Sequence, residues 1–81
     1  MKCKVRITIS LKGGMLDPEA RAIRHALENL GFATEALSTA RVFLITMEAA
    51  DGKEAEGRAA EMCERLLANP VIHRYEIEVM K

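Results

Sequence analysis

The stretch with the clearest chemical possibilities is LKGGMLDPEA, residues 11–20. Two adjacent glycines, Gly13 and Gly14, stand just before an aspartate and a proline that open a helix-like run. Free backbone N–H groups at such a point could bind a phosphate. However, the spacing matches neither G-x-x-x-x-G-K-[S/T] nor G-x-G-x-x-G, and Asp17 would repel an anion there. The pattern therefore favours a turn with a positive φ angle, followed by a capped helix, over a phosphate site.

The other side chains that could do chemistry are the histidines and one cysteine. His25 and His73 lie far apart, and neither has a neighbouring Cys or His at metal-ligand spacing. Cys63 falls on the apolar face of an expected helix, where a thiol usually packs as a small hydrophobic group. A nucleophile also needs a base within reach, and the sequence nominates none. These residues are therefore interpreted as structural or surface residues, and no catalytic residue is expected.

Composition narrows the class of protein. The chain has 81 residues, interpreted as one domain spanning 1–81, and its 12 basic and 12 acidic residues give no net charge. That balance, with only three aromatic residues (Phe32, Phe43 and Tyr75), disfavours nucleic-acid binding. Cys3 and Cys63 suit buried positions in a reducing compartment, and the chain shows neither a leader nor a membrane span. A cytoplasmic protein is the prediction.

The elements that must position these residues follow from periodicity. Apolar residues alternate with polar ones over residues 2–12, which predicts a half-buried strand. Asp17 as the N-cap, Pro18 at the first helical position and Gly31 at the end predict a helix over residues 18–30. Residues 32–38 and 41–48 are interpreted as two strands joined by a short turn. A second helix ends before Asn69-Pro70, and a last strand follows from residue 71.

The order strand, helix, strand, strand, helix, strand is typical of an α+β domain related to the ferredoxin-like βαββαβ fold, with an antiparallel sheet and two helices on one face. If the last strand lies antiparallel to the first, Lys4 and Arg6 come opposite Glu78 and Glu76. The strand at 41–48 carries apolar residues on both faces, which indicates that a second chain covers one of them. A dimer is therefore expected, and further pairing into a tetramer is left open.

Two longer stretches, VRITISLKGGMLDPEARAI (residues 5–23) and CERLLANPVIHRYEIEV (residues 63–79), together resemble the PurS family, the small subunit of phosphoribosylformylglycinamidine (FGAM) synthase. The resemblance implies a non-catalytic subunit in purine synthesis that bridges a glutaminase (PurQ-type) and an ATP-dependent synthetase (PurL-type). Glutamine-derived ammonia then converts formylglycinamide ribonucleotide to the amidine. The resemblance implies no cofactor in this chain, since the synthetase uses the ATP and Mg²⁺.

Carried over position by position, the resemblance nominates two segments for contact with the partner subunits. Both have glycines or prolines that permit close backbone approach or reduce the entropy lost on binding. The candidate contact residues are Lys12, Gly13, Gly14, Leu16, Asp17, Pro18, Asn69, Pro70, Val71 and Ile72. The alternative hypothesis, motivated by the glycine turn at a helix start, is a small-ligand regulatory module of ferredoxin-like type.

Overall fold

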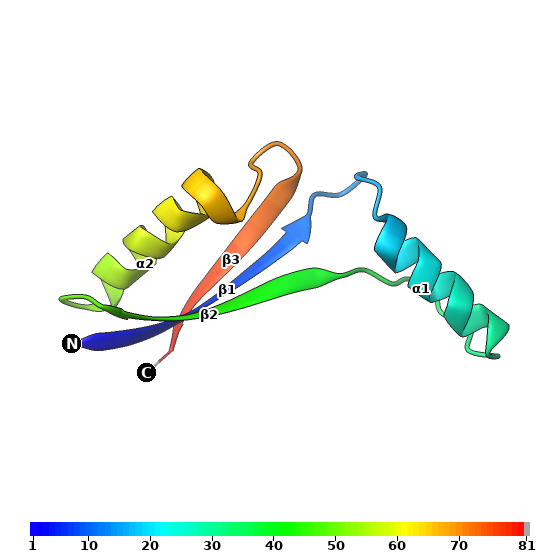
Figure 1. Cartoon of the computed structure of the whole chain (residues 1–81), viewed down its shortest axis with the longest axis horizontal. Coiled ribbons are helices and arrows are strands. Elements are labelled where there is room, and N and C mark those ends of the chain that lie inside the picture. Colours follow the sequence, from blue (N-terminus) through cyan, green and yellow to red (C-terminus); the bar gives the residue numbers. More distant parts are fainter. Residues whose placement is uncertain (81) are drawn as a thin grey trace.

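The computed structural model describes residues 1–80 as an elongated molecule of 50 × 26 × 16 Å. Three antiparallel strands form one sheet in the order β2-β1-β3 (Figure 1). In chain order the elements are β1 (Lys2–Leu11), α1 (Pro18–Asn29), β2 (Ala40–Glu48), α2 (Gly52–Met62), the π-helical turn η1 (Cys63–Leu67) and β3 (His73–Met80). The predicted α+β class with an antiparallel sheet is confirmed.

The core lies between β1 and α2. The alternation in β1 places Cys3, Val5, Ile7 and Ile9 on one face, and all four are buried. α2 contributes small side chains to the same core, among them Ala55 and Ala59, with Cys63 just beyond its end. Small residues on the helix allow its backbone to approach the strands closely. The opposite face of β1 is polar and carries the charged side chains of Lys4 and Arg6.

The sheet register confirms that the first and last strands pair, but it shifts the expected charge contacts. Arg6, not Lys4, lies opposite Glu78 and forms an ion pair with it. Lys4 lies opposite Met80, and Thr8 lies opposite Glu76. The expected pairing of Lys4 with Glu78 and of Arg6 with Glu76 was therefore wrong by two residues. Periodicity defines which face a side chain occupies but leaves register shifts of two residues open.

Local signals set both ends of α1 as predicted. Asp17 is the N-cap and accepts a hydrogen bond from the Ala20 backbone N–H (3.0 Å), and Pro18 occupies the first turn. At the other end Gly31 has φ +94°, and the N–H groups of Gly31 and Phe32 donate to the carbonyls of Glu28 and Leu27. This pair of hydrogen bonds is the Schellman motif, which favours glycine at its left-handed position.

Two expectations for the fold were wrong. Residues 32–38 form no strand, so the sheet has three strands where four were expected. Of the two α-helices in residues 1–80, α2 covers the sheet, whereas α1 projects beyond the end of the sheet (Figure 1). The reason is that β1 ends at Leu11, and the chain then turns away. Residues 32–38 consequently run past the end of β1 with no neighbouring strand of their own chain to accept their hydrogen bonds.

The second helix ends in a wider turn than expected. After α2, η1 forms a π-type turn in which the Ala68 N–H donates to the Cys63 carbonyl, 2.9 Å away. Ala68 then adopts an extended backbone, and the chain passes through the turn at Asn69 and Pro70 into β3. Val71 and Ile72 therefore belong to this turn, and β3 begins two residues later than predicted. Among residues 1–80, no helix is both long enough and apolar enough to cross a bilayer.

Candidate protein interaction site

The two segments nominated as contact sites lie together at one end of the sheet. The Lys12 N–H donates to the Ile72 carbonyl (2.8 Å), and the Lys12 ammonium donates to the Pro70 carbonyl (2.6 Å). We call residues 12–18 and 69–72 together the loop surface. Segments almost sixty residues apart in the sequence thus form one continuous surface, because β1 and β3 are neighbours and their connections leave the sheet at the same end.

Asn69 and His73 organise the second half of the loop surface. The Asn69 side-chain oxygen accepts from the Val71 N–H (3.0 Å), and the Asn69 carbonyl accepts from the His73 N–H (2.7 Å). The ring of His73 completes the turn, since its Nδ1 accepts from the Asn69 N–H at 2.9 Å. His73 is therefore a structural residue, as predicted. These hydrogen bonds hold the exposed side chain of Val71 in a defined position.

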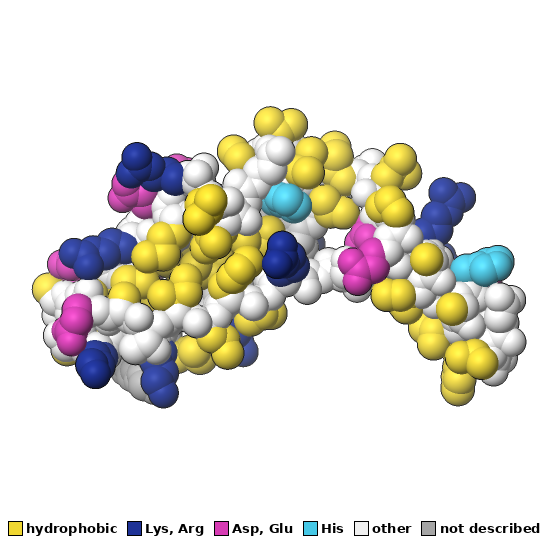
Figure 2. All heavy atoms as spheres, viewed as in Figure 1, with side chains coloured by type: hydrophobic (Ala, Val, Ile, Leu, Met, Phe, Trp, Pro, Cys, Tyr) yellow, Lys and Arg dark blue, Asp and Glu magenta, His cyan; other side chains and the backbone are white. Residues whose placement is uncertain are grey.

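Large apolar side chains are exposed on and beside the loop surface. Leu16 is 84% exposed and Val71 is 74% exposed, and Leu66 of η1 lies close by in the sequence with an exposure of 83%. Figure 2 shows apolar side chains gathered at the top of the molecule, where the connections of β1 and β3 leave the sheet. An exposed apolar group of this kind is typical of a protein interaction site. Leu66 and Met15 were not among the nominated residues, although both lie within the stretches that resemble PurS.

The first half of the loop surface is a turn closed by a carboxylate. Gly14 has φ +84°, as the glycine pair predicts, and no atom within 4 Å would meet a Cβ at Gly13 or Gly14. Hydrogen bonds from the Ala20 N–H and from the Thr39 hydroxyl, the latter 2.8 Å long, hold the pKa of Asp17 below its usual value. An ionised carboxylate therefore sits at the start of α1, where a phosphate would have to bind. This geometry favours the turn over the phosphate site.

A second exposed apolar region lies on α1 and β2. Ile23, Leu30 and Phe32, on α1 and just after it, are exposed, and α2 covers β1 and β3 but leaves the adjoining face of β2 open. On that face Phe43, Ile45 and Met47 are only half-buried. We call these three residues the β2 strip. Figure 2 shows apolar side chains both on one side of α1 and in the hollow beside α2.

The other face of β2 is also apolar in part, as expected. Val42 and Leu44 point away from α2 and are exposed. The β2 strip and these two residues together leave β2 with apolar surface on both sides. Arg41 partly shields the strip, because its guanidinium lies 5.4 Å from the centre of the Phe43 ring.

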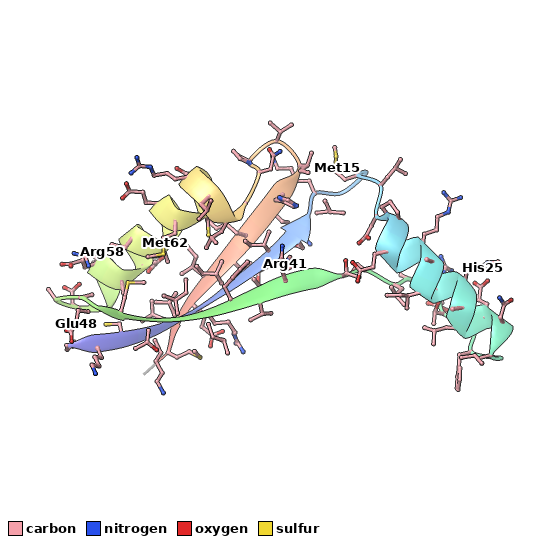
Figure 3. The ribbon with its side chains drawn as sticks, viewed as in Figure 1. Met15, His25, Arg41, Glu48, Arg58 and Met62 are labelled. Atoms are coloured by element: carbon pink, nitrogen blue, oxygen red, sulfur yellow. The ribbon has the colours of Figure 1, made fainter. Side chains whose placement is uncertain are left out.

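The cysteines and His25 show no sign of a catalytic or metal-binding role. Burial, and to a lesser extent the nearby Glu64 carboxylate, raises the pKa of the Cys63 thiol, so the reactive thiolate is disfavoured. Cys3 is a free, buried thiol as well. His25 projects into solvent from α1 (Figure 3). Within the part of the chain that the structure describes, no three His, Cys, Asp or Glu side chains cluster as metal ligands would.

These features define a class of protein: a small α+β domain with one covered sheet face, a projecting helix and two exposed apolar regions suited to association. Comparison with known proteins specifies it further. A sequence profile described as "PurS: Phosphoribosylformylglycinamidine (FGAM) synthase" matches residues 4–81. The chain belongs to the PurS family of FGAM synthase subunits.

Individual relatives agree with this assignment. FGAM synthase subunit PurS from Archaeoglobus fulgidus is 51% identical over 72 residues, covering 88% of this chain and 90% of the relative. The crystal structure of Methanocaldococcus jannaschii PurS, a subunit of an amidotransferase in the purine biosynthetic pathway, superposes with a TM-score of 0.88 at 41% identity, covering 100% of this chain and 98% of the other. A chain of the PurLQS structure from Thermotoga maritima superposes with a TM-score of 0.90 at 26% identity, covering 99% of each chain.

Proposed function

We propose that this chain is the non-catalytic assembly subunit of FGAM synthase, where it bridges the glutaminase and the ATP-dependent synthetase. The observation that carries the proposal is the match, over nearly the whole of both chains, to a chain of the PurLQS structure. The exposed apolar loop surface supports it, because a bridging protein needs contact surface and needs no reactive groups. The neighbouring subunits then perform the bond-making steps, and the complex functions in the cytoplasm.

The chemistry assigned to the complex explains what bridging contributes. The glutaminase releases ammonia, and the synthetase uses ATP and Mg²⁺ to activate the formyl amide oxygen of formylglycinamide ribonucleotide. Ammonia then displaces the activated oxygen. Free ammonia would be diluted and protonated in bulk water, so holding the two enzymes together raises its effective concentration at the synthetase. The contribution of this chain is therefore geometric.

We further propose that the working form is a homodimer in which the apolar side of α1 from one copy covers the β2 strip of the other. In a ferredoxin-like domain a second helix would lie beside α2, and here that place is open while α1 of the same chain lies beyond the sheet (Figure 1). Both surfaces are apolar and exposed, and a chain of 81 residues gains much from burying them. A single 9.0 kDa species at micromolar concentration in sedimentation would contradict the dimer.

Reconstitution tests the assembly role. Adding the purified chain to the synthetase and glutaminase is expected to increase glutamine-dependent amidation by at least about tenfold, because the ammonia source then lies beside the synthetase. The control uses an ammonium salt in place of glutamine, which should reduce the dependence on this chain. Unchanged glutamine-dependent activity would overturn the proposal. Binding of a nucleotide or amino acid by the isolated chain without any such increase would instead favour a regulatory module.

Val71→Asp tests the loop surface. A carboxylate buried in an apolar contact loses its hydration, so binding to the synthetase and glutaminase is expected to weaken by about tenfold or more, measured by surface plasmon resonance. Val71 is exposed, so the free energy of unfolding should change by less than about 0.5 kcal/mol. The matched control is Ala50→Asp, an exposed position beyond the other end of β2, which should bind normally. Equal binding by both variants would place the contact elsewhere.

A further inference from the structure

The projecting part of the chain, residues 15–36, is internally held together; we call it the arm. It contains α1 and the segment that returns toward β2 (Figure 1). The Schellman hydrogen bonds close the end of α1, and Arg24 then fixes the returning segment. Its Nε donates to the Thr34 hydroxyl (3.2 Å), and its guanidinium also donates to the Thr34 carbonyl (2.7 Å). The arm is therefore expected to move as a unit.

The first connection between arm and sheet is anchored at Lys12, and beyond it a single backbone hydrogen bond, from the Met15 N–H to the Lys12 carbonyl (3.2 Å), spans the glycine turn. Hydrogen bonds from Lys12 to Pro70 and Ile72 hold that residue against the loop before β3. The next two residues, Gly13 and Gly14, are exposed, and no atoms crowd the positions that side chains would occupy there. Glycine has no Cβ, so its backbone can adopt a wide range of φ and ψ angles. The glycine turn by itself therefore permits many directions for the arm.

A carboxylate joins the two connections. Asp17 accepts the Ala20 N–H with Oδ1 and the Thr39 hydroxyl with Oδ2, at 3.0 and 2.8 Å. Ala20 belongs to the first turn of α1, while Thr39 directly precedes Ala40, the first residue of β2. One ionised side chain therefore links the start of the helix to the start of the strand. The Thr39 backbone N–H also faces this carboxylate and helps to lower its pKa. The hydrogen bonds of the Arg24 side chain, by contrast, stay within the arm.

We propose that the hydrogen bond between Asp17 and Thr39 is a clamp that sets the direction of the arm relative to the sheet, and so orients the arm for the second copy. Asp17 and Thr39 act as positioning residues in this role. The clamp itself is inferred from the observed hydrogen bonds alone. Its effect on self-association rests on the proposed homodimer. A fixed direction matters for binding because the arm then loses less conformational freedom when it docks.

Thr39→Val is the variant that separates the clamp from helix capping. Valine keeps the shape of threonine and removes the hydroxyl, while Asp17 still accepts the Ala20 N–H and still caps α1. Thr46→Val is the matched control, since Thr46 is an exposed threonine within β2, outside the clamp. Both variants should have the same helical content by circular dichroism.

The direction of the arm is measured by pulsed electron–electron double resonance. Spin labels are placed at Arg21→Cys on the arm and Lys53→Cys on α2, both exposed positions, and labelled chain is diluted with unlabelled chain so that only distances within one chain are recorded. The labelled chain with Thr39 intact and the labelled Thr46→Val variant should both give one narrow distribution of the distance between the two labels. Thr39→Val should broaden it at least about twofold. A distribution that stays narrow in Thr39→Val would overturn the clamp.

Sedimentation equilibrium on the unlabelled chains tests the consequence. The dimer dissociation constant of Thr39→Val should rise by about tenfold, which corresponds to about 1.4 kcal/mol. That magnitude is close to the lower end of the range for a hydrogen bond to a charged group. An unchanged dissociation constant alongside a broadened distance distribution would overturn the link to self-association. A wild-type chain that is monomeric would overturn the homodimer, and the distance measurement would still test the clamp.

Discussion

Replacing Ile23 with aspartate is expected to convert the dimer into monomer, raising the dissociation constant by about a hundredfold or more. Ile23 is 40% exposed on the apolar side of α1, so the substitution leaves the fold of one chain intact. In the proposed dimer it would put a carboxylate against the β2 strip, where burial strips the charge of water without supplying a partner. Sedimentation equilibrium measures the change directly, and glutamine-dependent amidation should fall in parallel if the dimer is the working form.

His25→Asp is the control for that experiment. His25 lies on the other side of the same helix and projects into solvent (Figure 3), so the same aspartate is introduced with a similar cost in helix propensity. The dissociation constant should stay within about threefold of the unaltered chain. If Ile23→Asp associates as tightly as His25→Asp, the apolar side of α1 has no part in self-association. A surface other than α1 of the second copy would then have to pack against the β2 strip.

The largest expected loss of stability comes from Ile7→Ala. Ile7 is fully buried at the centre of β1, between β2 and β3 and on the face covered by α2. Removing its side chain should lower the free energy of unfolding by about 2–5 kcal/mol, because burial energy is lost and a cavity remains. That is a large share of the roughly 5–15 kcal/mol typical of a whole domain. Urea unfolding at a fixed protomer concentration measures the loss.

Two further variants make the result specific to packing. Ile7→Val keeps most of the buried volume and should cost about 0.5–1.5 kcal/mol. Leu16→Ala removes a similar side chain from an 84% exposed position on the loop surface and should change the free energy of unfolding by less than about 0.5 kcal/mol. Equal losses for Ile7→Ala and Leu16→Ala would show that the core does not lie between β1 and α2.

The contact residues nominated from the sequence are neighbours in the folded chain. The structure also reveals residues that the sequence did not suggest. Lys12 and the turn at Asn69 face one another through hydrogen bonds that require β1 and β3 to be neighbours. The sequence did not nominate Thr39, because nothing in its local sequence indicates that Asp17 lies within hydrogen-bond distance. Leu66 could have been found as an apolar residue in a motif, yet its exposure is known only from the packing.

The amino-acid sequence by itself determined the local structure: the alternating face of β1, the capped start of α1 at Asp17 and Pro18, its end at Gly31, and the antiparallel α+β class. These features depend on side-chain period, backbone angles and hydrogen bonds within a few residues, so they can be read from nearby residues. Only the tertiary structure decided that residues 32–38 form no strand, that Arg6 faces Glu78, and that α1 projects from the sheet. Those outcomes depend on which distant segments are close enough to share hydrogen bonds and apolar surface, and on where β1 ends.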